Sequence, residues 1–75
     1  MDYREWGMEY LGEAERLKRH TAPLRQQLKR VSGETEVLLF RRISMLNEMY
    51  LECLHTGRCL LEKGDSFEAR NKPEP

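Results

Sequence analysis

The chain has 75 residues, of which 39% are hydrophobic and 35% are charged, and its 13 basic residues balance its 13 acidic ones. This length suits one small domain whose own core gives only marginal stability. The composition is too apolar for a disordered chain, and the absence of net charge excludes a strong overall attraction to nucleic acid or to an anionic membrane.

Nothing in the sequence resembles a signal for export or for membrane insertion. Charged residues interrupt every apolar run near the N-terminus, which is unlike a secretory signal. No stretch approaches the roughly 18 to 20 apolar residues of a membrane-spanning helix. Cys53 and Cys59 therefore fit free thiols in a reducing compartment. We expect a cytoplasmic protein with no membrane partner.

The first predicted helix runs from residue 3 to residue 31. Asp2 can cap its N-terminus, with Glu5 three residues further on. Apolar or small residues then recur at alternating steps of four and three, which is typical of a helix packed along a near-parallel or antiparallel partner. These residues are Tyr3, Gly7, Tyr10, Ala14, Leu17, Thr21, Leu24, Leu28 and Val31.

Pro23 interrupts this first helix. A proline in a helix interior costs about 3 kcal/mol, although a first turn tolerates it. The sequence therefore predicts either a kink near residues 20–23 or a break there, with Thr21 as the cap of a restarted helix. Because the four-three pattern keeps its phase across the proline, we favour a kink in one continuous helix.

A short turn over residues 32–34 should separate the two helices. Gly33 can adopt the left-handed conformation that ends a helix, and Ser32 or Thr35 can cap the next one. Short connections between helices force them to lie antiparallel. The predicted fold class is therefore all-α, an antiparallel helical hairpin of two long helices.

The second predicted helix runs over residues 35–63, with Gly64 as its stop. The expected hairpin domain thus covers residues 1–64. Residues 65–75 are polar and include two prolines, so we expect a flexible C-terminal tail.

The second helix has an apolar surface that is too wide for one partner helix to cover. One four-three row docks the first helix, and it consists of Leu39, Ile43, Leu46, Tyr50, Cys53, Gly57 and Leu60. Projection at about 100° per residue places further apolar residues on both flanks of this row. Those flanking residues are Leu38, Met45 and Met49 on one side, and Phe40, Leu51, Leu54 and Leu61 on the other.

Such a surface would leave an exposed patch larger than monomers usually tolerate. We therefore predict that these seven flanking residues form an oligomer interface, with a homodimer arranged as a four-helix bundle. A compact three-helix monomer bent at Pro23 and a complex with a different protein are the alternatives.

Charge is unevenly distributed along the chain. Residues 16–42 hold eight basic and two acidic residues, whereas residues 1–15 hold five acidic and one basic residue. A hairpin would therefore be basic near its turn and acidic near its termini. This polarity could orient an antiparallel dimer, or the basic half could contact nucleic acid. The candidate contacts are Lys18, Arg19, Arg25, Lys29, Arg30, Arg41 and Arg42.

A catalytic or metal site is not indicated. His55 and Cys59 are one helical turn apart, but Cys53 faces the apolar row, and two ligands are fewer than the four of a usual zinc site. No third group orients the His55–Cys59 pair for catalysis. We expect no cofactor and no enzymatic activity. The hypothesis is a self-associating interaction module, with a nucleic-acid-associated regulator or a subunit of a hetero-complex as alternatives.

Overall fold

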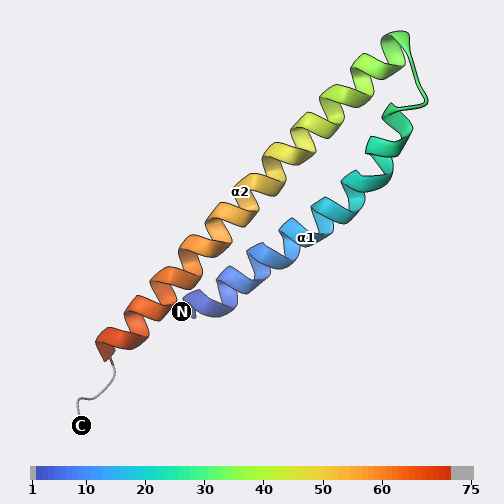
Figure 1. The fold of residues 1–75 in the computed structure, drawn as a ribbon. Helices are drawn as coiled ribbons and strands as arrows, with labels where there is room; N and C mark the ends of the chain where they lie inside the picture. The colour runs from blue at the N-terminus through green and yellow to red at the C-terminus, as the bar shows by residue number, and fades with distance from the viewer. Residues whose placement is uncertain (1, 72–75) are drawn as a thin grey trace.

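The computed structural model describes residues 2–71 of the chain, and side chains up to residue 66. Two helices make up the structure, α1 (Tyr3–Leu28) and α2 (Gly33–Asn71). Figure 1 shows them lying side by side and antiparallel, with the loop at one end and α2 extending past the start of α1 at the other. The result is a rod of 66 × 16 × 14 Å. The predicted all-α helical hairpin is confirmed.

The predicted N-terminal cap of α1 is also confirmed. The Asp2 carboxylate accepts hydrogen bonds from the backbone amides of Arg4 and Glu5 at 3.0 and 3.2 Å. These amides belong to the first turn and have no carbonyl partner inside the helix, so the cap satisfies them.

Pro23 lies inside α1, which continues through it to Leu28. The break considered from the sequence is therefore wrong, and Figure 1 shows one continuous helix whose axis bends toward the loop. Thr21 does not cap a new helix. Its hydroxyl donates a 2.6 Å hydrogen bond to the Leu17 carbonyl, a contact that often bends helices. Proline lacks the amide that would bond one turn back, which also favours a bend.

Both helix boundaries near the turn differ from those predicted. α1 ends at Leu28 instead of residue 31. The chain then forms a turn, in which the Arg30 amide donates a hydrogen bond to the Gln27 carbonyl three residues back, at 2.9 Å. Gly33 has the expected positive φ, 68°, but it is the first residue of α2.

The predicted end of the second helix at residue 63 is wrong, since α2 continues to Asn71. Gly64 is a buried packing residue instead of a helix stop, and a Cβ placed on it would lie 3.2 Å from the Arg4 amide nitrogen. The contact with the first turn of α1 explains why a glycine is used in mid-helix despite a cost of about 1 kcal/mol. The flexible tail predicted from residue 65 is thus helical up to residue 71, and residues 72–75 lie outside the described residues.

The helices meet along the predicted four-three rows. Every residue of the α1 row is buried or half-buried, and so is every residue of the α2 row. Ala14, Leu17 and Ile43 are the buried hydrophobic residues, with Thr21 as a buried polar one. We call these two rows together the inter-helix seam. Its confirmation shows that the periodicity located the contact surface correctly.

Candidate functional site

The two halves of the hairpin pack differently. We call the half near the loop the turn half, comprising residues 17–28 of α1 and 33–51 of α2. The terminal half comprises residues 3–14 of α1 and 53–66 of α2. Small residues bring the helices together in the terminal half, where a Cβ on Gly7 would lie 2.9 Å from the Gly57 carbonyl oxygen. A Cβ on Gly57 would lie 2.8 Å from the Leu11 side chain. Only glycine allows so close an approach.

The large apolar side chains of α2 that are exposed all lie in its turn half, among the residues whose side chains are described. Met45 is 63% exposed, and Leu38 and Phe40 are each 58% exposed. A side chain in a helical core is normally covered by neighbours on several sides, and α1 covers only one face of α2. The exposed set is Val37, Leu38, Phe40, Met45, Met49 and Leu51.

Five of the seven residues predicted as an oligomer interface belong to this exposed set, and two do not. Leu54 and Leu61 are half-buried. The Leu61 side chain lies 3.1 Å from the Cβ position of Gly7, so it packs inside the hairpin. Because the glycines draw α1 close, they bring residues of this flank into the seam. Val37, which the sequence did not single out, joins the exposed apolar surface at 51% exposure.

Two grooves between the helices flank the seam in the turn half. A groove of about 270 Å³ is lined by Lys18, Thr21, Ala22, Arg25, Asn47 and Tyr50. A second, of about 500 Å³, is lined by Gln27, Arg30, Val31, Thr35, Leu38, Leu39 and Arg42. Each groove therefore has two of the predicted basic residues on its rim.

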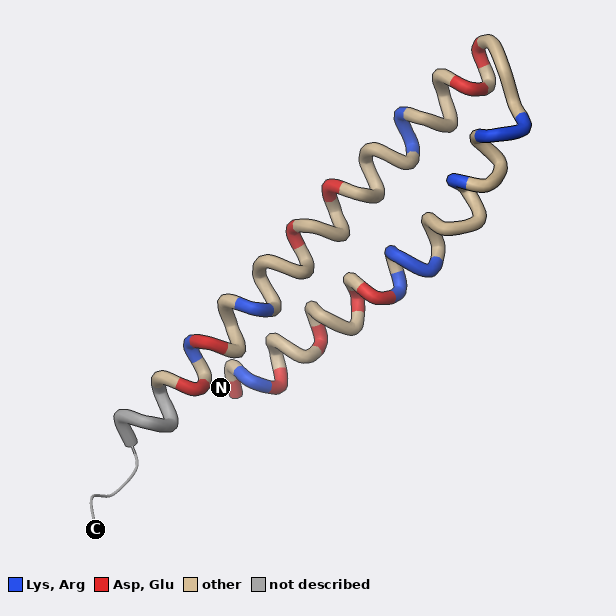
Figure 2. Tube along the Cα trace, viewed as in Figure 1, with Lys and Arg blue, Asp and Glu red and all other residues tan. Residues whose placement is uncertain are grey.

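In Figure 2 more of the blue, basic positions lie toward the loop than toward the termini, although both ends hold some. All seven candidates for nucleic-acid contact are exposed. Arg19 pairs with Glu15 at 3.6 Å, which reduces its local charge. Lys18 and Arg25 border one groove, whereas Arg30 and Arg42 border the other. A phosphate backbone would need these cations on a common face.

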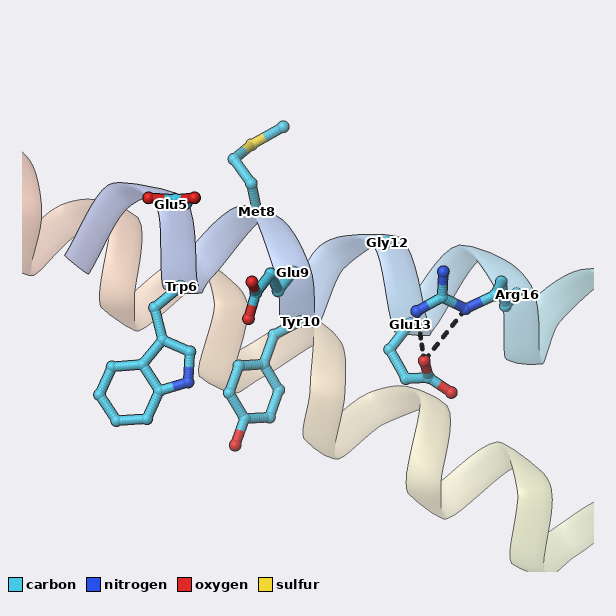
Figure 3. Close-up of a pocket in the computed structure, with 8 residues that line it drawn as sticks. All are labelled: Glu5, Trp6, Met8, Glu9, Tyr10, Gly12, Glu13 and Arg16. Atoms are coloured by element: carbon cyan, nitrogen blue, oxygen red, sulfur yellow. Dashed lines mark hydrogen bonds and ion pairs between the residues drawn. The ribbon is translucent and has the colours of Figure 1, made fainter. Parts of the chain in front are cut away.

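A hollow of about 790 Å³ lies on the outer side of α1, mainly in the terminal half. All eight lining residues come from α1, so no second element encloses it. Figure 3 shows the Trp6 and Tyr10 rings on one side of the helix and Met8 on the other. The ring centroids are 6.3 Å apart, and the Arg16 guanidinium donates to the Glu13 carboxylate. This is an open surface and does not have the form of a substrate pocket.

His55 and Cys59 are adjacent on α2, with the imidazole Nε2 3.7 Å from the thiol Sγ. Within the described part of the chain, no three His, Cys, Asp or Glu side chains converge as metal ligands. No described helix is long and apolar enough to cross a membrane. The described side chains thus include an exposed apolar surface on α2 and no cluster of three metal-ligating residues.

Comparison with known proteins adds no family to this description. No protein-family model matches the chain, and no curated protein or solved structure matches it either.

Proposed function

We propose that this chain is a non-enzymatic, cytoplasmic interaction module that assembles with copies of itself through the turn half of α2. The observation that carries the proposal is the exposed set on α2, with Met45 63% exposed and Leu38 and Phe40 58% exposed. Six large apolar side chains within four turns of one helix are exposed, on the two flanks of its seam. A soluble chain lowers its free energy by about 25 cal/mol for each Å² of such surface that it buries.

A second copy of the hairpin is a suitable cover for this surface. Homo-oligomers most often have twofold symmetry, in which the same patch on each copy meets its equivalent. Two hairpins that pair through α2 would place both second helices at the centre of a four-helix bundle, with the first helices outside.

The test is the mass of the wild-type protein in solution and its change when each flank of α2 is charged. One variant combines Met45→Glu with Met49→Glu, and another combines Phe40→Glu with Leu51→Glu. We expect at least one to dissociate the assembly in sedimentation equilibrium, because a buried unpaired carboxylate costs several kcal/mol.

The control is Met8→Glu, which places the same charge at a methionine that is 59% exposed on α1, outside the turn half. It should leave the mass unchanged. A wild-type protein that is a well-folded monomer at micromolar concentration would contradict the proposal, and retention of full assembly by both double variants would show that the interface lies elsewhere.

A further inference from the structure

One side of α2 carries a second four-three pattern, distinct from the inter-helix seam. Val37, Ser44 and Leu51 are seven residues apart, and Phe40, Asn47 and Leu54 each follow three residues later. Val37, Phe40, Ser44 and Leu51 are exposed, while Asn47 and Leu54 are half-buried beside α1. We call these six residues the outer strip. Such a spacing is that of a helix prepared to pack along another helix.

Charged side chains border the outer strip at the same spacing. Glu34, Arg41, Glu48 and His55 are each seven residues apart and so form one row along α2, which we call the charged row. All four are exposed. Among the described residues none of them forms an ion pair, and the His55 imidazole lies 3.7 Å from the Cys59 thiol. The first three alternate in the sign of their charge, with His55 after them.

We infer that the outer strip packs antiparallel against the outer strip of a second copy, with Arg41 of each copy facing Glu48 of the other. This inference rests on the proposed self-association and adds its face, direction and register. In an antiparallel pair, the residue numbers of any two positions that face each other add up to the same total. Pairing Phe40 with Leu51 of the second copy also places Ser44 opposite Asn47, and Val37 opposite Leu54.

The same register also places opposite charges of the two copies' charged rows beside each other. The charged row follows every second core residue by one position, here Phe40, Asn47 and Leu54. In antiparallel coiled coils this row lies beside its equivalent on the partner. With Phe40 opposite Leu51, this rule sets Arg41 beside Glu48 of the second copy and Glu34 beside His55. Apolar pairs, a polar central layer and opposite charges therefore agree on one alignment.

Other alignments lose the attraction between Arg41 and Glu48. In a parallel pair the charged rows of the two copies would lie on opposite sides of the interface and would not meet. A shift of the antiparallel pair by seven residues would place either Arg41 against itself or Glu48 against itself. Like charges at such positions are unfavourable and act mainly on specificity and orientation. The charged row thus selects the second copy in one direction.

The first experiment reverses charges and measures the dimer dissociation constant by sedimentation equilibrium at low ionic strength. Arg41→Glu and Glu48→Arg should each weaken dimerisation by about tenfold, because each replaces two attractive pairs by two repulsive ones in the symmetric dimer. Combining both changes in one chain should restore the wild-type constant. The control is Arg42→Glu, an equal charge change on the opposite flank, which should change the constant by less than about twofold.

A wild-type dimer whose dissociation constant is unaffected by the single reversals would overturn this register while leaving self-association intact. A wild-type monomer would overturn both. A dimer weakened by Arg42→Glu or by the Met45→Glu, Met49→Glu pair, and not by Arg41→Glu, would place the interface on the other flank.

The second experiment traps the alignment covalently. In a chain that also carries Cys53→Ala and Cys59→Ala, we would compare Val37→Cys, Leu54→Cys and their mixture under mild oxidation. The inferred register places position 37 of one copy opposite position 54 of the other. By contrast, position 37 of one copy lies roughly 25 Å along the axis from position 37 of the other, and the same holds for position 54, which is far beyond disulfide reach. Only the mixture should form a crosslinked dimer. Crosslinking of each variant with itself would demonstrate a parallel pair and overturn the inference.

Discussion

The terminal half and the turn half of this hairpin use the same periodicity with different side chains. In the terminal half, Gly7, Gly57 and Gly64 bring the backbones into contact, and the neighbouring leucines of α2 are half-buried. In the turn half, the seam contains larger residues such as Ile43 and Leu39, and apolar side chains on both flanks of α2 stay exposed. Close helix approach therefore determines how much of α2 one partner helix can cover.

Truncation of the seam in the turn half should have the largest effect on stability. Ile43 is 7% exposed, so Ile43→Ala should lower the free energy of unfolding by about 3 kcal/mol, through lost burial and the cavity that remains. Urea unfolding at a fixed protein concentration measures this. Met8→Ala is the control, since Met8 is 59% exposed on α1 and lies outside the proposed interface, and it should cost much less. Equal losses would mean that the seam covers Ile43 no better than an exposed side chain is covered.

A methyl group in the terminal half should have the next largest effect. Gly7→Ala should lower the free energy of unfolding by about 1–2 kcal/mol, because the added Cβ would lie 2.9 Å from the Gly57 carbonyl oxygen and separate the helices. The higher helix propensity of alanine relative to glycine would offset part of this loss.

Gly12 gives the control for that substitution on the same helix. A Cβ on Gly12 meets nothing within 4 Å, so Gly12→Ala should raise stability by about 0.5–1 kcal/mol. Thermal unfolding of the two variants side by side makes the comparison. If both substitutions stabilised the protein, close backbone contact at Gly7 would be refuted.

Loss of a surface ion pair should have the smallest effect. Arg19 and Glu15 are 3.6 Å apart, with side chains that are 76% and 55% exposed. Arg19→Ala should therefore change the unfolding free energy by no more than about 0.5 kcal/mol, and high salt should abolish the difference. A loss above about 1 kcal/mol would show that the pair belongs to a larger network.

The local pattern predicted much of this structure. The four-three rows identified both faces of the inter-helix seam, from Gly7 to Leu28 and from Leu39 to Leu60, because a helix must turn its apolar side toward its partner. Asp2 was identified as a cap for the same kind of local reason. Predictions failed where a residue acts through a distant contact. Gly64 resembles a helix stop in sequence, but it packs against Arg4 some sixty positions away.

The exposed apolar surface of α2 was predicted in part. The exposure of Leu38, Phe40 and Met45 follows from their position beside the seam, which the sequence places correctly. Leu61 was misassigned because its coverage depends on how closely Gly7 brings α1 to α2. Helix spacing is set by the side chains of both partners, so projection of one helix alone could not supply it.

The mass of the wild-type protein in sedimentation equilibrium tests the central claim most directly. One chain has a mass of 9.0 kDa. Self-association through the turn half of α2 predicts twice that mass at micromolar concentration, decreasing toward 9.0 kDa on dilution. A fully helical protein that stays at 9.0 kDa throughout would contradict it.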